Sequence, residues 1–231
     1  MKFERGVTHV IFFDIEYYVP REHRNGPGLR ANPYLDGSFI MGGVFQRYFP
    51  IDEKPEKKEE FWIWDMDGEE TLEGGNLLKK IYHYFRESWT RWELFGGDPR
   101  LTEPIAVGFG ITRLDVPVLF VRSMIHRIAE PEKLYDTYFK LRHFDLSVAS
   151  APVVPERRYQ KVLAPVSQNW AVRNLLEDER RKPSGATVWE LYDAGNYHAI
   201  IEKTKSEVEI TKRTYIKLKK LRNGLVDYFE S

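Results

Sequence analysis

The chain has 231 residues, with 35 Lys and Arg against 35 Asp and Glu, and it contains no cysteine. Zero net charge is not expected of a uniformly basic nucleic-acid coat protein, although it allows a local basic groove. The absence of cysteine excludes thiolate nucleophiles, zinc fingers, iron–sulfur clusters and disulfides, and the six histidines do not fall at metal-ligand spacing. Any metal site is therefore expected to use carboxylates. The length suits a single domain, 1–231, that buries its own core.

The first part of the chain predicts three strands. Val10–Phe13 is a continuous apolar run rich in β-forming residues, which is typical of a strand buried on both faces. Residues 20–37 are rich in Pro and Gly and predict a long loop. Ser38–Phe49 and Phe61–Trp64 are the next predicted strands, and the charged segment 52–60 between them predicts a solvent-facing hairpin or loop.

The rest of the chain alternates predicted helices and strands. We expect helices over 76–93 and Val116–Ile128, short strands over Pro104–Phe109 and Phe144–Val148, and an almost wholly helical region from Asn169 onward. Three early strands followed by alternating elements indicate an α/β fold, with a mixed β-sheet flanked by helices on both faces.

The sequence contains no obvious export or membrane segment. The apolar run Val10–Phe13 is too short for a signal peptide and ends at Asp14. Nothing approaches the roughly 18 apolar residues that a membrane span needs. We therefore expect no membrane partner and a cytoplasmic protein.

Two acidic residues follow the first apolar run. Asp14 and Glu16 are two positions apart on a strand and so point to the same face. Neighbouring carboxylates at the end of an apolar strand repel each other and lose hydration, and a hard cation such as Mg²⁺ or Mn²⁺ would resolve both costs. The alternative is a strand that simply runs out into solvent.

Two further acidic residues are candidates for the same site. Asp115 follows a Gly-rich turn after the strand 104–109, where it could instead cap a helix. Glu207 borders the expected buried stripe of a late helix, formed by Val208, Thr211, Tyr215 and Leu218. Glu207 could instead be paired with Lys203, its i,i+4 neighbour.

These stretches occur in the order of a known family: Asp14-x-Glu16, then Gly110-x-x-x-x-Asp115-x-Pro117-x-Leu119, then Glu207 in a late helix. The set resembles the DEDD 3′–5′ exonucleases of the ribonuclease H-like fold. Within them it looks most like the proofreading-exonuclease domains of family B DNA polymerases and their stand-alone relatives. The resemblance covers roughly residues 8 to 222.

The resemblance implies a ribonuclease H-like sheet and a site for two divalent metal ions, Mg²⁺ or Mn²⁺. Asp14 would bridge both ions, Glu16 would bind one, Asp115 would bind the second directly or through water, and Glu207 would be the fourth ligand. Two cations about 4 Å apart serve both ends of an in-line displacement. The implied activity is hydrolysis of the terminal phosphodiester at the 3′ end of single-stranded DNA, with RNA as the other possible substrate.

The third motif departs from the family pattern. It normally reads Tyr- or His-x-x-x-Asp, and here these positions are Lys203 and Glu207. The group that orients the attacking water is therefore absent, unless Tyr197 or His198 replaces it. An extra methylene in Glu207 displaces its oxygens by about 1 Å, which can cost roughly a hundredfold in rate. The alternative hypothesis is therefore a nucleic-acid-binding module that kept the fold and lost activity.

Candidate nucleic-acid contacts lie near these motifs. From residue 202 to 222 there are eight Lys and Arg against three Glu, a strip that suits a polyanionic strand or is simply a solvated helix face. Stacking on a base is expected of Tyr17, and phosphate contacts are expected of Arg21, Lys203, Lys212 and Arg213. No polymerase or helicase segment fits in the chain, so a replication or repair partner would be a separate protein.

Overall fold

The computed structural model describes residues 5, 8–25, 32–66, 75–94, 103–153, 164–177 and 187–230, with side chains described as far as 221. Six strands form one mixed sheet: β1 (Val10–Tyr18), β2 (Phe39–Phe49), β3 (Lys54–Pro55), β4 (Glu59–Trp62), β5 (Ile105–Gly108) and β6 (Arg142–Asp145). The strand order is β3-β2-β1-β5-β6, and β4 also pairs with β2. β1 runs antiparallel to β2 and parallel to β5, and β6 runs parallel to β5.

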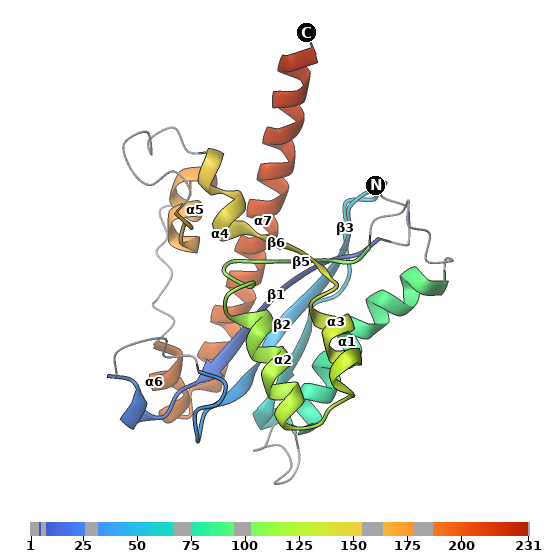
Figure 1. Ribbon diagram of the computed structural model, residues 1–231. Helices are drawn as coiled ribbons and strands as arrows, with labels where there is room; N and C mark the ends of the chain where they lie inside the picture. Colours follow the sequence, from blue (N-terminus) through green and yellow to red (C-terminus); the bar gives the residue numbers. More distant parts are fainter. Residues whose placement is uncertain are drawn as a thin grey trace.

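Helices cover both faces of the sheet (Figure 1). One face carries α1 (Gly75–Leu94), α2 (Asp115–Ile125) and α3 (Pro131–Tyr138). The other carries α4 (Leu146–Ala149), α5 (Gln168–Leu175), α6 (Thr187–Asp193) and α7 (Tyr197–Glu230). Three short 3-10 segments complete the described elements: η1 (Arg21–His23), η2 (Ile63–Asp65) and η4 (Ala151–Val153). The predicted α/β class, with a mixed sheet between two helical layers, is confirmed.

β1 separates two hydrophobic cores. Ile11 and Phe13 belong to the core beneath α1 to α3, whereas Val10 and Phe12 belong to the core beneath α4 to α7. This alternation confirms that the strand is buried on both faces, because each face meets its own layer of helices. The strand extends to Tyr18, beyond the apolar run itself. Its even-numbered residues therefore face α7.

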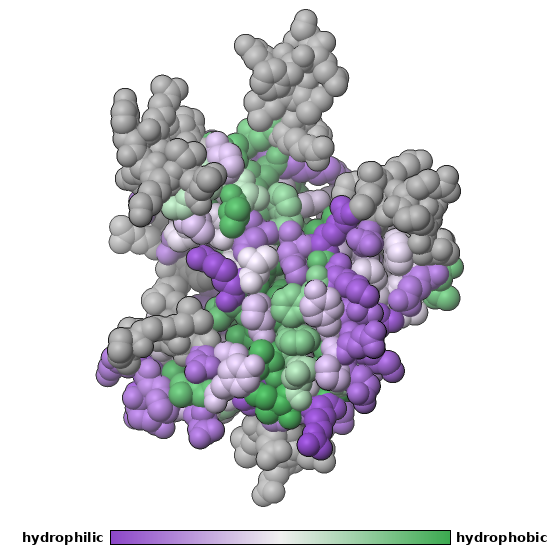
Figure 2. Space-filling view, viewed as in Figure 1, coloured by the Kyte–Doolittle hydropathy of each residue, from purple (hydrophilic) through white to green (hydrophobic). Residues whose placement is uncertain are grey.

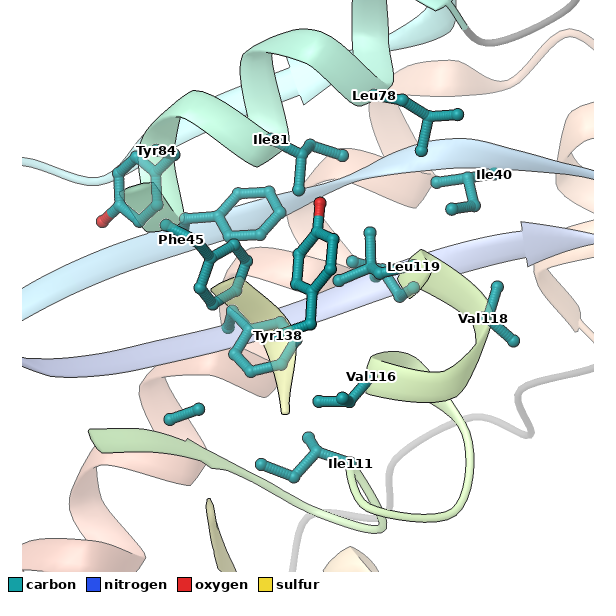
Figure 3. Close-up of a cluster of buried hydrophobic side chains, with 14 of the residues drawn as sticks. Ile40, Phe45, Leu78, Ile81, Tyr84, Ile111, Val116, Val118, Leu119 and Tyr138 are labelled. Carbon is teal, nitrogen blue, oxygen red and sulfur yellow. The ribbon is translucent and has the colours of Figure 1, made fainter. Parts of the chain in front are cut away.

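The core over α1 and α2 fixes the position of the turn after β5. Leu78 and Ile81 of α1 and Val116 and Leu119 of α2 point into one space over β1 and β2, around the ring of Tyr138 (Figure 3). The side of α1 that helical spacing predicts to be buried packs there, apart from the half-buried Trp92 at its end, and its buried members are Leu77, Ile81, Tyr84, Phe85 and Ser88. Packing of this kind holds α2, and with it the turn that precedes it, against the sheet.

Two glycines of β2 allow the neighbouring strands to approach closely beside the acidic end of β1. Gly43 lies opposite Ile15, and a Cβ there would be 2.6 Å from the backbone oxygen of Asp14. Gly42 lies opposite Glu16 with φ of +149°, and a Cβ there would be 2.2 Å from the backbone oxygen of Phe61. Larger residues at either position would push neighbouring strands apart beside the carboxylates.

Some predicted boundaries were wrong. The predicted strand Phe144–Val148 is instead the end of β6 followed at once by α4, because the Asp145 side chain accepts a hydrogen bond from the Ser147 amide and starts a helix. The helix α3 was not predicted, although Pro131 marks its first turn. In the predicted loop 20–37, residues 26–31 lie outside the described residues.

The surface in the view of Figure 2 is mixed. An apolar area lies over α2, where Met124 and Ile125 are exposed, and polar residues flank it. Scattered exposed apolar side chains of this kind are common on folded proteins. In the part of the chain that the structure describes, no helix has both the length and the apolar character needed to cross a bilayer.

Candidate metal centre

Three carboxylates from two distant parts of the chain meet beside β1. One ligand oxygen from each of Asp14, Glu16 and Glu207 lies within 4.8 Å of the others. Glu16 and Glu207 are only 7% and 2% exposed, and Asp14 is half-buried. Oxygen ligands gathered this closely are the donor set that Mg²⁺ and Mn²⁺ prefer, so the cluster could hold a divalent ion.

Helix α7 brings Glu207 to β1 because its apolar stripe packs on the same side of the sheet. Val208, Thr211, Tyr215 and Leu218 are buried along this stripe, as expected. The Gln168 side chain of α5 donates a 3.0 Å hydrogen bond to the carbonyl of Glu207 and fixes that turn of the helix. The glutamate is thus held by backbone and core contacts, independently of any ion.

Lys203 lies inside the carboxylate cluster. Its Nζ is 2.9 Å from Glu16 Oε1 and 2.7 Å from Glu207 Oε1, and its side chain is 8% exposed. The i,i+4 pair with Glu207 was an alternative prediction from the sequence. Glu16 lies 187 positions from Lys203 in the chain, so this second contact could not be predicted from the sequence. The ammonium group therefore bridges two of the three carboxylates, and it is turned inward, away from the phosphate contact expected of it.

The electrostatics of the site follow from burial and charge. Burial raises the pKa of Glu16, and the Glu207 carboxylate acts in the same direction, while Lys203 opposes both. Burial also disfavours the charged form of Lys203, but the carboxylates of Glu16, Glu207 and Asp14 outweigh it and hold the pKa of the ammonium above its usual value. Lys203 is therefore a cation in this site.

The hydroxyl group of Thr204 also contacts the Glu16 carboxylate. Thr204 Oγ1 lies 2.8 Å from Glu16 Oε1 and 2.8 Å from the carbonyl of Ile200, and its proton is donated to one of these acceptors at a time. Glu16 Oε1 therefore faces two neighbouring donor groups, from Lys203 and Thr204, both on α7. These contacts tie the end of β1 to the helix.

Asp115, the fourth predicted ligand, is buried at the first residue of α2 and lies outside the group of three. Asp115 is the first residue of α2 rather than its N-cap, which is Leu114. The turn before Asp115 is held by Asp145, which accepts hydrogen bonds from the amide of Gly110 at 2.8 Å and the hydroxyl of Thr112 at 2.6 Å. Asp145 is thus a structural residue near the site.

The residues expected to contact nucleic acid differ in how far they are buried or paired with other side chains. Tyr17 is buried in the core under α1 to α3, and its hydroxyl donates to the carbonyl of Asn32 at 2.8 Å, which leaves little of the ring for stacking on a base. Lys212 pairs with Glu209 at 2.8 Å. Arg213 is half-buried on α7. Acidic neighbours therefore offset part of the charge of the expected basic strip.

A second polar cluster was not found from the sequence. Arg21, Arg24 and the hydroxyl of Tyr18 each donate a 2.8 Å hydrogen bond to the carboxylate of Asp193 at the end of α6. The two arginines and Tyr18 hold the pKa of Asp193 well below its usual range, with the Arg24 hydrogen bond as the strongest cause. The cluster ties the segment after β1 to α6, and Arg21 remains mostly exposed, with 75% of its side chain accessible.

The two candidate replacements for a water-orienting residue differ in position. Tyr197 stacks on Trp64, with ring centroids 4.5 Å apart and an interplanar angle of 5°. The ring is thus engaged in an aromatic stack. His198 is exposed at the first turn of α7.

No family model and no curated protein matches this sequence. Among solved structures, the chain is similar to exonuclease I, with a TM-score of 0.51 and 12% sequence identity over 96% of this chain. The match covers 43% of exonuclease I, so this chain spans less than half the length of that protein. At this level of identity the likeness concerns the fold, and it fits the ribonuclease H-like fold expected from the sequence.

Proposed function

We propose that the chain is a metal-dependent 3′–5′ exonuclease that hydrolyses the terminal phosphodiester of single-stranded DNA. The observation that carries the proposal is the convergence of Asp14, Glu16 and Glu207 beside β1, in a fold similar to that of exonuclease I. Glu16 and Glu207 are buried carboxylates that lie 191 positions apart in the sequence, and such groups are costly unless a cation compensates them. Metal binding in a nuclease site would compensate this cost.

In this proposal the carboxylates have distinct roles. Asp14, Glu16 and Glu207 hold divalent ions, Mg²⁺ or Mn²⁺, and Asp115 is the fourth carboxylate, acting directly or through water. When bound, two such ions supply an activated water and stabilise the departing 3′ oxygen. The chain supplies the rigid frame: β1 and α7 are fixed by their cores, and α2 is fixed by the Asp145 hydrogen bonds.

The substrate contacts remain predictions. Arg21 pairs with Asp193, but 75% of its side chain is accessible near the end of β1, and we propose that it contacts a phosphate there. Lys212 and Arg213 lie further along α7. We propose single-stranded DNA as the substrate, with RNA as the alternative. We propose a replication or repair protein as its protein partner.

A second candidate function is a nucleic-acid-binding module without catalysis. The specific observation in its favour is the Lys203 ammonium between Glu16 and Glu207, where the family has a residue that orients water. In this case the lysine compensates the carboxylates permanently. Both candidates share the fold and differ in whether DNA is cut.

The experiment that separates them is a time course on 5′-labelled single-stranded DNA with Mg²⁺, Mn²⁺ or EDTA. We expect a metal-dependent ladder that shortens from the 3′ end, and we expect Asp14→Ala to reduce its rate by at least about a hundredfold, since losing even a group that supports a metal ligand costs 10- to 100-fold. Glu202→Ala is the matched control, because Glu202 is an exposed acidic residue on the same helix as Glu207.

The outcomes are distinct. Intact DNA under all conditions with retained DNA binding would support the non-catalytic module, provided that a labelled RNA also remains intact. Cleavage of RNA alone would move the substrate to RNA. Undiminished hydrolysis by a contaminant-free Asp14→Ala preparation would contradict the assignment of this site.

A further inference from the structure

We propose that Lys203 is an internal counter-ion that takes the place of a metal ion between Glu16 and Glu207, so that a divalent ion binds this pair only by displacing the ammonium group. The inference concerns the same site as the proposed function, and it deepens it by stating what controls metal occupancy. It depends on three features of the site: its charge, the space around Lys203 Nζ and the direction of the lysine side chain.

The charge of the cluster requires a cation whether or not a metal is bound. Three carboxylates, two of them buried, each place one oxygen within 4.8 Å of the others, and they repel strongly if nothing compensates them. Lys203 Nζ forms short ion pairs with both buried members. Its positive charge makes the folded site stable without a metal ion.

The space between Glu16 and Glu207 accommodates one cation. Lys203 Nζ is 2.9 Å from one carboxylate and 2.7 Å from the other. An ion bound by these two oxygens would approach them still more closely, at about 2.0–2.1 Å for Mg²⁺. The ammonium and such an ion therefore cannot occupy this position together, and metal binding becomes an exchange.

The direction of Lys203 is specific to this residue. Lys205, two positions later on α7, points outward and pairs with Glu60 at 3.0 Å and Glu202 at 3.2 Å. By contrast, the whole Lys203 side chain is buried, so its displacement also moves an aliphatic chain out of a packed position. Lys205 is thus a natural control with the same chemistry and no contact with the cluster.

The test compares Mn²⁺ binding by the intact chain and by Lys203→Met, which keeps the length of the side chain and removes its charge. Binding is measured from the loss of the electron paramagnetic resonance signal of unbound Mn²⁺. We expect Lys203→Met to bind Mn²⁺ at least about tenfold more tightly, because no competing cation remains. Lys203→Arg, which keeps the charge, and Lys205→Met should both bind as the wild type does.

Thermal unfolding gives a second readout. We expect the unfolding temperature of the wild type to change little between EDTA and Mn²⁺, and that of Lys203→Met to be low in EDTA and to rise strongly with Mn²⁺. If Lys203→Met fails to fold in EDTA but folds in Mn²⁺, the proposal is supported. If it fails to fold in both, the Lys203→Gln variant replaces it in the same comparison.

Equal Mn²⁺ affinity of the wild type and the uncharged variants would overturn the proposal, as would tight binding by Lys203→Arg. These results differ from those that decide the proposed function. Tighter Mn²⁺ binding by Lys203→Met with no DNA hydrolysis by any variant supports the counter-ion and contradicts the exonuclease. If the wild type hydrolyses DNA and binds Mn²⁺ as tightly as Lys203→Met does, the exonuclease is supported and the counter-ion is contradicted.

Discussion

Asp145 Oδ2 lies 2.6 Å from the hydroxyl of Thr112, and this contact joins the end of β6 to the turn that leads into α2. The other oxygen accepts hydrogen bonds from the amide of Gly110 and from the amide and hydroxyl of Ser147. Burial alone raises the pKa of this carboxyl group, but these donors outweigh it and leave the pKa below its usual value. One carboxylate therefore fixes both the start of α4 and the turn before Asp115.

We expect Asp145→Ala to destabilise the fold by about 2–3 kcal/mol, since it removes a helix cap and leaves several donors without their acceptor. In a chain of this size that loss lowers the unfolding temperature by roughly 5–10 °C. The proposed nuclease activity should fall as well, because Asp115 loses the turn that holds it. Thermal unfolding by circular dichroism, run alongside the labelled-DNA assay, measures both effects.

The control for this variant is Asp136→Ala. Asp136 is a partly exposed residue of α3 that pairs with Lys140 at 2.6 Å. Exposed pairs of this type contribute at most about 1 kcal/mol. Equal unfolding temperatures of Asp145→Ala and Asp136→Ala would contradict the structural role of Asp145.

Much of the fold was predictable because its signals are local. The apolar run of β1 and the helical stripes of α1 and α7 depend on the spacing of residues within one element. The same spacing shows that Asp14 and Glu16 share a face. The end of β6 was mispredicted because Asp145 has a β-forming neighbour, Phe144, but starts a helix through its side chain.

The contacts that define the site could not be read from the sequence. Lys203 was visible as a neighbour of Glu207, but its second partner, Glu16, becomes adjacent only when α7 packs on β1. The cluster around Asp193 likewise joins residues 169 to 175 positions apart. Such pairings depend on tertiary packing, which leaves no periodic pattern in the chain.

Shortening the Glu207 side chain tests whether Glu207 takes the place of the final Asp of the third motif. We expect Glu207→Asp to raise nuclease activity or Mn²⁺ affinity severalfold. It restores the side-chain length found in the exonucleases that the sequence resembles, and it weakens the 2.7 Å ion pair with Lys203. Single-turnover rates on labelled DNA and Mn²⁺ titrations provide the measurements. If Glu207→Ala changes neither quantity, Glu207 is not a ligand.

Arg47 is the main buried cation on the other side of the sheet. Its guanidinium lies 3.9 Å from the centroid of the Tyr84 ring, and it donates to the Tyr84 carbonyl and to the Ser88 hydroxyl. We expect Arg47→Met to destabilise the fold by about 2–3 kcal/mol through loss of these hydrogen bonds and of the cation–π contact. Arg47→Lys should recover only part of this loss, because an ammonium cannot reproduce the planar fork.

Chemical denaturation measures the Arg47 effect directly as a free energy of unfolding. Arg86→Met is the control, because Arg86 is a more exposed arginine that pairs with Glu93 at 3.3 Å. We expect the control to change the free energy by about 0.5 kcal/mol or less. A similar value for Arg47→Met would mean that its contacts contribute little.

His9 makes the stability of the fold depend on pH. The ring is fully buried against Phe49, and neither ring nitrogen has a hydrogen-bond partner among the described residues. Burial lowers the pKa of His9 from 6.5 to about 4, and the positive charges of Arg91 and Arg47 act in the same direction. Between these two pH values the unfolded chain binds a proton at His9 that the folded chain does not.

The contribution of His9 to stability is therefore complete above about pH 6.5 and is lost as the pH falls toward 4, by roughly 3 kcal/mol. We expect His9→Leu to remove this part of the pH dependence, and His83→Leu, at an exposed position of α1, to leave it unchanged. Denaturant unfolding of the three proteins at pH 4.5, 5.5, 6.5 and 7.5 measures the slopes, with the first three pH values inside the window of about 4 to 6.5 and the last above it. A wild type and a His9→Leu variant with parallel curves would show that His9 is protonated in the folded state or accessible to water.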